Sequence, residues 1–363
     1  MRPKAGAPTP RETRLRRAQT LVLTWKRDRL LLFNYRTRAG VTARPLSVVL
    51  LNAFDRWTRP AQACRRLAGY TPESLDRAFL ALTRSGLLLR EGSEEAAAEA
   101  RFQEVWGSWL PEAGYFHFAT KDFPYGTNKR LGEAMLRRFL AESPQPPFFK
   151  SYPGAAGLEL RRPAERGDFY QTLMRRRTHR RFGRGDLPID QLSSLLFHTF
   201  GVTGFKPTPV VGRLPLKTSP SGGARHSIEV YVVALRVKGL APGIYHYAPD
   251  RHALDEIRTG PMEVNAERFC AGQAWVRRAA ALFVMTSVFP RVMWKYRFSR
   301  AYRVVLAETG HFAQTLCLVA TQLELAPFCT MALGESAIEK EIGLDGVVES
   351  PLYAAGVGLL PRR

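Results

Sequence analysis

An arginine-rich stretch near the middle of the chain is the first group of residues that could do chemistry. It reads Arg-Arg-Arg-Thr-His-Arg-Arg-Phe over residues 175–182 and follows the helical run Phe169–Met174. Guanidinium groups beside a hydroxyl can hold a phosphate through forked, charge-assisted hydrogen bonds. A solvated basic loop would have the same composition, because arginine is common throughout this chain. Composition alone leaves both interpretations open.

A second group, Pro220–His226, reads Pro-Ser-Gly-Gly-Ala-Arg-His and precedes the predicted strand Ile228–Leu235. A Gly-Gly step lets the backbone approach a flat ligand closely, and successive N–H groups there can face a developing negative charge. A plain tight turn before a strand is the alternative interpretation.

A third group, Lys295 and Tyr296, comes before a strongly apolar helix that contains Glu308 and His311. A lysine beside a tyrosine can accept and donate a proton when burial or a neighbouring cation lowers one pKa. The alternative is one exposed cation beside one packed ring. The embedded Glu308 and His311 are expected to be satisfied polar groups of the core.

The bulk composition favours a globular protein of two domains. The chain has 363 residues, of which 45% are hydrophobic and 24% charged, and this length suits two domains. No apolar run approaches the roughly 20 residues of a membrane helix. The run 279–289 ends at Pro290 and predicts a buried strand. No secretory core follows the basic N-terminus, so a cytoplasmic protein without a membrane anchor is expected.

The four cysteines predict no metal site. They include no Cys-x-x-Cys pair and no nearby histidine at metal-ligand spacing, so reduced and mostly buried thiols are expected. These residues are Cys64, Cys270, Cys317 and Cys329. The net charge of +22 would suit an anionic partner. However, the arginines are spread along the chain, so a general surface bias explains the charge equally well.

The elements that must position these groups divide into four regions. Residues 1–18 predict a basic flexible tail, and 94–168 a connecting region that is helical over 94–111 and rich in proline from 143. Residues 169–363 alternate helices and strands. Residues 19–93 predict two strands (20–25 and 30–35), three helices (46–54, 61–67 and one opened by Thr71-Pro72) and a strand at 87–90.

Three helices followed by a strand outline a winged helix. In nucleic-acid binders the third helix enters the major groove, but here it mixes Glu73 and Asp76 with Arg77 and Arg84. That mixture is poor for contacting phosphates, so nucleic acid is not the expected partner. The other use of such a module is to add a peptide strand to an exposed sheet edge. Residues 19–93 resemble the small winged-helix modules that hold leader peptides in peptide-maturation enzymes.

Taken together, the motifs run in the order of a known family. Arg-x-Thr-x-Arg-x-Phe at 176–182 is followed by Pro-Ser-Gly-Gly at 220–223 and by Pro-Gly-x-Tyr-x-Tyr at 242–247. Lys-Tyr at 295–296, Glu-x-Gly-His at 308–311, Gly-Glu at 334–335 and Ala-Gly-Val-Gly at 355–358 complete the set. In this order they resemble the SagB/McbC-type FMN-dependent dehydrogenases of the nitroreductase superfamily.

The resemblance implies an α+β fold, a nitroreductase-like three-layer sandwich that forms a homodimer with FMN at the interface. It assigns catalysis to Lys295 and Tyr296. It implies that the FMN-binding residues are Arg176, Arg177, Thr178, Arg180, Pro220, Ser221, Gly222, Gly223, Arg303, Gly334 and Glu335. Two features depart from the family pattern. Thr178 replaces the usual serine and keeps the hydroxyl, and Arg362 and Arg363 end the chain where a longer tail would contact phosphate.

The expected function is an FMN-dependent dehydrogenase that matures a ribosomally synthesised peptide, oxidising azoline to azole rings. Its partners would be the precursor peptide, a second copy of the chain and a cyclodehydratase or other peptide-modifying enzyme. One alternative is flavin-dependent reduction of dehydroamino acids or another desaturation of a peptide. An alternative of a different class is a non-catalytic winged-helix peptide- or DNA-binding protein with a degenerate flavin domain.

Overall fold

The computed structural model describes residues 13–43, 45–67, 69–109, 111–124, 129–142, 167–209 and 212–361. Most of the expected tail, the proline-rich connection over 143–166 and the two terminal arginines lie outside the described residues. The contacts divide the chain into two compact units. Unit 1 comprises Met1–Lys121 with Phe289–Arg303, and unit 2 comprises Asp122–Val288 with Val304–Arg363. The sequence predicted one domain boundary at residue 168, whereas the chain crosses between these units after Lys121, Val288 and Arg303.

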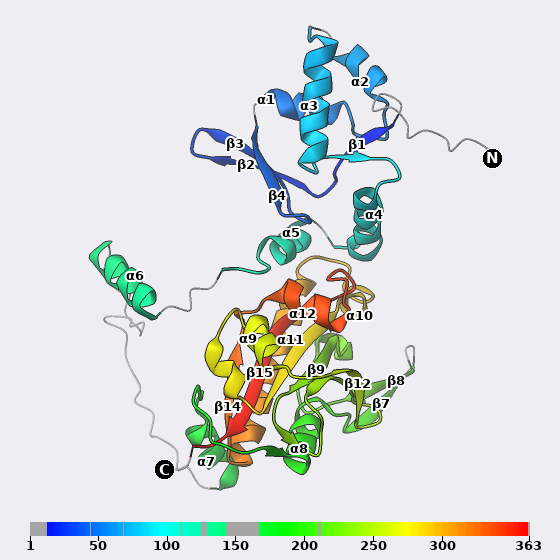
Figure 1. The fold of residues 1–363 in the computed structure, drawn as a ribbon. Helices are drawn as coiled ribbons and strands as arrows, with labels where there is room; N and C mark the ends of the chain where they lie inside the picture. The colour runs from blue at the N-terminus through cyan, green and yellow to red at the C-terminus, as the bar shows by residue number, and fades with distance from the viewer. Residues whose placement is uncertain are drawn as a thin grey trace, which may run out of the picture. The chain divides into compact units, whose positions relative to one another are not determined.

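A three-stranded antiparallel sheet opens unit 1, in the order β2 (Leu21–Lys26), β3 (Arg29–Asn34) and β4 (Ala39–Ala43) (Figure 1). The first two strands lie where the sequence predicted them. The tail prediction is wrong at its end, because β1 (Leu15–Arg17) pairs with β5 (Leu88–Arg90). The buried side chain of Leu15 stabilises that pairing, and a solvated tail would leave it in water.

Three helices follow the sheet, α1 (Pro45–Asn52), α2 (Pro60–Arg66) and α3 (Pro72–Arg84). Thr71 begins α3 as predicted, because its hydroxyl accepts a hydrogen bond from the N–H of Ser74 over 3.3 Å. The apolar stripe of α3 is buried in the core of this part of unit 1. The three-stranded sheet precedes the helices and only β5 follows them, so the winged-helix outline of this region stays a prediction.

Unit 1 also contains α4 (Glu94–Trp106), α5 (Pro111–Ala119) and the returning segment with α10 (Phe289–Met293). These helices share a cluster of buried aromatic rings. The cluster joins residues that are far apart in the sequence. It explains why the contacts assign Phe289–Arg303 to the first unit.

Unit 2 is built on a six-stranded antiparallel sheet in the order β12-β11-β9-β13-β15-β14 (Figure 1). The seven residues Ala281–Ser287 of the central strand are all fully buried, which explains the uninterrupted apolar run in the sequence. The strands are β9 (Ile228–Ala234), β11 (Gly243–Ala248), β12 (Ala253–Thr259), β13 (Ala281–Val288), β14 (Leu325–Thr330) and β15 (Glu349–Leu359).

Helices cover both faces of this sheet. Leu282 and Val284 point to one face and pack in a core with α9 (Glu263–Phe269) and α12 (Glu335–Ile342). The other face is equally buried, and there α8 (Ile189–Phe200) and α11 (Ala301–Gln322) stack Phe200 on Phe312 with ring centroids 5.2 Å apart. The arrangement confirms the predicted α+β sandwich. The remaining elements are α6 (Lys129–Glu142), α7 (Asp168–Arg175), β6 (Leu187–Pro188), β7 (Gly204–Thr208), β8 (Gly212–Leu216) and β10 (Val237–Lys238).

Among the described helices, α11 alone has the length and hydropathy that a membrane-spanning helix would need. It nevertheless packs as a core helix. Its Glu308 is 1% exposed and accepts a hydrogen bond from Ser227, and Phe312 and Leu316 are fully buried. The pattern therefore reflects burial within unit 2.

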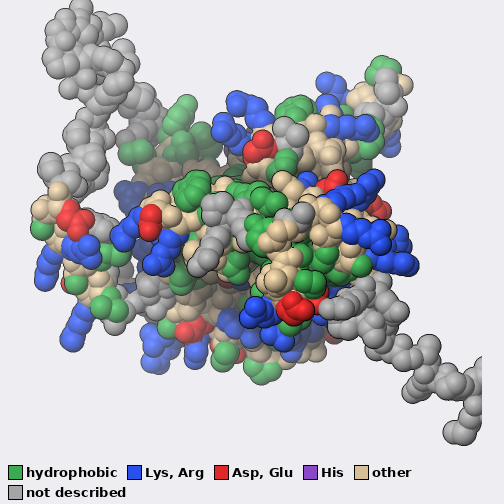
Figure 2. Space-filling view, turned by 90° about the horizontal axis from the view of Figure 1, so that it is seen from above, with side chains coloured by type: hydrophobic (Ala, Val, Ile, Leu, Met, Phe, Trp, Pro, Cys, Tyr) green, Lys and Arg blue, Asp and Glu red, His purple; other side chains and the backbone are tan. Residues whose placement is uncertain are grey.

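Basic side chains are dispersed over the face shown in Figure 2. Lysine and arginine lie at many points of it, with aspartate and glutamate between them. This distribution supports the interpretation of the +22 charge as a general surface bias on this face.

Candidate functional site

The arginine-rich segment lies along β14 and the end of β15. The N–H of His179 donates to the carbonyl of Pro327 over 2.9 Å, and the N–H of Gly183 donates to the carbonyl of Leu359 over 2.8 Å. The segment is therefore fixed to the sheet at two points, although it is not itself a strand.

The side chains of this segment form a cluster of donors on that fixed backbone. Arg177, Thr178 and Arg180 are exposed, and Arg176 is half-buried. The guanidinium of Arg177 folds back onto two main-chain carbonyls at 2.8 Å, and that of Arg180 lies 5.8 Å from the ring centroid of Trp275. Burial and nearby Arg176 lower the pKa of His179. Forked cations beside a hydroxyl are the donor set that a phosphate monoester requires.

A glycine in β15 makes room for the ring that holds this segment in place. A Cβ on Gly358 would lie 2.5 Å from Cδ1 of Phe182, which is too close for two carbon atoms that are not bonded to each other. Phe182 packs there between Phe328 and Trp275, with centroid distances of 5.8 and 6.3 Å. The Ala-Gly-Val-Gly motif therefore packs against the arginine motif, although the two are far apart in the sequence.

The Pro220–His226 segment forms a tight loop with an unusual backbone. Gly223, Ala224 and His226 have φ angles of 61°, 53° and 43°. Residues other than glycine rarely adopt such positive φ angles. The hydroxyl of Ser221 accepts the N–H of His226 over 2.8 Å and closes the loop. A plain tight turn does not need two strained residues that carry side chains, so this geometry favours the interpretation of a binding segment.

One face of α11 holds this loop. The hydroxyls of Ser219 and Thr315 are 2.7 Å apart, and Nδ1 of His311 lies 3.3 Å from the carbonyl oxygen of Pro220. A Cβ on Gly222 would meet a methyl group of α11 at 2.2 Å. The contacting residues of α11 recur at helical spacing. They are Val304, Glu308, His311 and Thr315.

Glu308 is the charged member of that face. Its carboxylate accepts from the hydroxyl of Ser227 over 3.4 Å and interacts with that of Ser221. Burial raises the pKa of Glu308, and the bond from Ser221 and the charge of Lys217 partly oppose that rise. The buried carboxyl group of Glu308 therefore interacts with serines on both sides of the turn, Ser221 and Ser227.

Gly334 and Glu335 begin α12 next to a reciprocal cap. The N–H of Gly334 donates to the carbonyl of Phe269 over 3.0 Å. The Glu335 carboxylate accepts the N–H of Asp122 over 2.8 Å, and the Asp122 carboxylate accepts the N–H and hydroxyl of Ser336 over 3.0 and 2.7 Å. Glu335 therefore has a structural role, and its expected place near FMN stays a prediction.

Lys295 and Tyr296 lie together in a loop of unit 1. The Lys295 ammonium is 5.5 Å from the Tyr296 ring centroid. Both backbone N–H groups donate to the carbonyl of Val292, over 3.1 and 2.9 Å. Lys295 is exposed and Tyr296 is half-buried. Arg303, the predicted residue of the next helix, is exposed in the first turn of α11.

The expected site residues are thus held by β14 and β15, by α11, by Asp122 at the start of α12 and by the loop after α10. The sequence did not indicate the role of some of the residues that hold them. Glu308 and His311 were expected to be plain core residues, but they hold the Pro220 loop. Polar residues at helical spacing within an apolar helix were the available signal. Asp122 carried no such signal, because its partners are more than 200 positions away in the sequence. Among the described residues, no group of three His, Cys, Asp or Glu side chains could hold a metal ion.

The family model described as "Nitroreductase family" matches residues 173–359, about half of the chain. Together with the six-stranded sandwich, this match defines the class: the chain belongs to the nitroreductase family.

The relatives of this chain include proteins named for the processing of trifolitoxin and of microcin B17. The chain is 26% identical to the trifolitoxin-processing protein TfxB of Rhizobium leguminosarum bv. trifolii over 330 residues, which cover 87% of this chain and 88% of TfxB. It is 29% identical to the microcin B17-processing protein McbC of Escherichia coli over 180 residues, which cover 48% of this chain and 63% of McbC. It also aligns with a chain of the E. coli microcin synthetase McbBCD complex at a TM-score of 0.47 and 24% identity, covering 74% of this chain and 93% of that chain. The match to the family model confirms that the chain is a nitroreductase-family protein, as the motifs predicted.

Proposed function

We propose that this chain is an FMN-dependent dehydrogenase that oxidises azoline to azole rings in a ribosomally synthesised peptide, in the cytoplasm. The observation that carries the proposal is the arginine segment, in which half-buried Arg176 and exposed Thr178 and Arg180 lie on a backbone fixed to the sheet. That donor set suits the phosphate of FMN. The peptide substrate is supported by the similarity to TfxB, which extends over 87% of this chain and so beyond the family domain.

The chain's own residues would divide the work. The arginine segment and Thr178 would hold the phosphate, and Pro220–Gly223 would line the flat ring, in a homodimer that brings both segments to each cofactor. The chemistry that bound FMN supplies is acceptance of a hydride from a ring carbon and return of the electron pair to molecular oxygen. Lys295 or Tyr296 would take the proton from the neighbouring ring atom, so that the ring loses two hydrogen atoms in all.

The first prediction tests the cofactor and the base together. Purified protein should show the visible absorption of a flavin and release FMN on denaturation. Lys295→Ala should keep that FMN and lose azoline oxidation by about 10²–10⁴-fold, the usual contribution of a general base. The measurement is the mass of an azoline-containing peptide after incubation with enzyme and oxygen.

Lys238→Ala is the matched control, because Lys238 is also exposed but lies in β10, outside the site. A colourless protein that does not bind added FMN would refute the cofactor and favour a non-catalytic binding protein. A flavoprotein that leaves azolines intact but reduces dehydroamino acids would support the alternative reaction on the same peptide class.

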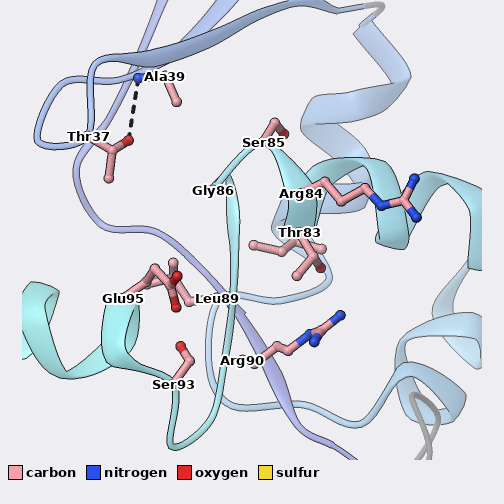
Figure 3. A pocket seen from close by; sticks show the side chains of 11 residues that line it. Thr37, Ala39, Thr83, Arg84, Ser85, Gly86, Leu89, Arg90, Ser93 and Glu95 are labelled. Atoms are coloured by element: carbon pink, nitrogen blue, oxygen red, sulfur yellow. Dashed lines mark hydrogen bonds between the residues drawn. The ribbon is translucent and has the colours of Figure 1, made fainter.

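We also propose that unit 1 binds part of the precursor peptide. Within the described residues, β4 pairs with β3 alone, so its other edge can accept an added strand. A cavity of about 440 Å³ lies between the β3–β4 turn, the end of α3, β5 and the start of α4 (Figure 3). Arg84 and Arg90 line it together with one carboxylate, that of Glu95, and the hydroxyls of Thr37 and Ser93, so its charged lining is basic on balance. These donors favour an acidic residue of the peptide.

The second prediction follows from that charge. Arg84→Glu with Arg90→Glu should weaken binding of the fluorescent precursor peptide, measured by anisotropy, by at least about 10-fold because one ion pair becomes a repulsion. Arg101→Glu with Arg138→Glu is the matched double control, since these two arginines are on helices and neither lines the cavity. Equal loss in the two double variants would mean that only the overall charge attracts the peptide.

A further inference from the structure

A tryptophan outside the site contacts the loop that carries Lys295 and Tyr296. The indole N–H of Trp109 donates to the main-chain carbonyl of Tyr296 over 2.9 Å. Trp109 is 5% exposed, so this bond is shielded from water. A buried donor from the N-terminal half of the chain therefore holds the backbone at one of the two residues expected to transfer protons.

The turn between α4 and α5 places this indole. Helix α4 ends at Trp106, and the N–H of Trp109 donates to the carbonyl of Trp106 over 2.8 Å. A Cβ on Gly107 would lie 2.6 Å from the carbonyl oxygen of Gln103, so the tight turn requires glycine. The two indole rings meet edge to face at 5.3 Å. The turn therefore directs both tryptophans into one aromatic cluster.

The same cluster buries the two ends of the loop. Trp106 lies 4.9 Å from Phe289, and Trp109 lies 5.9 Å from Tyr302, between ring centroids. The Tyr302 hydroxyl is 2.7 Å from Nδ1 of buried His117. Phe289 is fully buried and Tyr302 is 7% exposed. Both ends of the segment are thus fixed by packing, and its middle by the Trp109 bond.

Several side chains in the middle of the segment are exposed, and Tyr296 is half-buried. Trp294 is 57% exposed and Phe298 is 51% exposed, and Lys295 is exposed as well. A loop whose backbone is held by a buried donor while its side chains remain accessible suits the presentation of reactive groups at a constant position. A buried indole N–H needs an acceptor, and the acceptor of Trp109 is the main-chain carbonyl of Tyr296.

We propose that Trp109 is a positioning residue for the proton-transfer loop 294–300: its N–H fixes the main chain at Tyr296 and so the placement of the Lys295 and Tyr296 side chains. The inference rests on the proposed function of that loop. Trp109 contacts neither substrate nor cofactor in this role and acts through Tyr296 alone.

The third prediction concerns Trp109→Phe, which tests the proposal because it removes the N–H and keeps an aromatic ring in the cluster. Amide hydrogen exchange over residues 294–300 should accelerate about 10-fold, as for loss of one buried hydrogen bond. The kcat for peptide oxidation should fall about 10-fold or more because the reacting groups lose their alignment, while KM and FMN content stay unchanged. Trp57→Phe is the matched control, since Trp57 lies in the same unit under the guanidinium of Arg16.

The outcomes separate this inference from the function on which it rests. Exchange over 294–300 that matches the Trp57→Phe control would overturn the positioning role, whatever the activity. Suppose that Lys295→Ala inactivates the enzyme and that Trp109→Phe accelerates exchange but leaves kcat unchanged. This result would also overturn the positioning role, because catalysis would then not depend on the bond from Trp109. If Lys295→Ala is itself fully active, the proposed role of the loop has failed, and the exchange data alone decide whether Trp109 holds the loop.

Discussion

At the scale of single residues, the sheet of unit 2 contains a histidine surrounded by carboxylates. Nε2 of His246 is 2.8 Å from the carboxylate of Glu229, and Nδ1 is 3.9 Å from that of Asp255. The bond to Glu229 raises the pKa of His246 above 6.5, with burial opposing the rise and Glu349 and Asp255 adding to it. Burial in turn raises the pKa of Glu349. These groups lie outside the expected site, so they affect stability without entering the proposed reaction.

The fourth prediction is a pH dependence of stability. Because the folded pKa of His246 exceeds its unfolded value, its contribution is fully present below about pH 6.5 and is lost as pH rises through the folded pKa. His246→Gln should therefore reduce the free energy of unfolding by on the order of 1 kcal/mol at about pH 6 and by less at about pH 9. Urea denaturation at both pH values measures this, with exposed His198→Gln as the control. A loss of equal size at both pH values would contradict the charge-dependent explanation.

At the scale of elements, the end of β15 matters because it supports the arginine segment. The fifth prediction concerns Gly358→Ala, which would place a Cβ 2.5 to 2.9 Å from three carbon atoms of Phe182. The crowding should destabilise the protein by about 1–3 kcal/mol. It should also weaken FMN binding, because displacement of Phe182 moves the phosphate-binding backbone. Thermal unfolding and fluorescence titration with FMN measure the two effects.

Gly310→Ala provides the control for that change. A Cβ at Gly310 in α11 meets no atom within 4 Å, and alanine favours a helix over glycine by about 0.5–1 kcal/mol. Gly310→Ala should therefore be neutral or stabilising and should leave FMN affinity unchanged. Loss of FMN in both variants would show that the effect does not depend on Phe182.

Local signals predicted individual elements well and their partners poorly. Thr71-Pro72 predicted the start of α3, and the apolar run before Pro290 predicted β13, because caps and buried strands depend on neighbouring residues. The strand β4 has the sequence Ala-Gly-Val-Thr-Ala, in which Val and Thr favour a strand and Ala and Gly do not, so pairing with β3 decides its conformation. The bond from Trp109 to Tyr296 spans 187 positions, a distance at which a single sequence shows no pattern.

At the scale of the whole molecule, the chain passes from unit 1 to unit 2, returns for Phe289–Arg303 and leaves again. The family motifs predicted the nitroreductase-like sandwich correctly, and the matched residues 173–359 contain all six strands of the sheet of unit 2. They did not predict the return, because Phe289 and Tyr302 have the composition of any buried aromatic residue. The segment with the expected proton-transfer residues thus shares its core with the N-terminal half of the chain.

This interleaving has a consequence for synthesis on the ribosome. The nascent chain presents Trp106 and Trp109 before Phe289 and Tyr302, their ring partners, have been translated. At about 5–20 residues per second, completion of that aromatic core has to wait on the order of 10–40 s. During this interval the first unit carries an apolar surface that its own later sequence will cover. The N-terminal half therefore cannot complete its folding as an independent early domain.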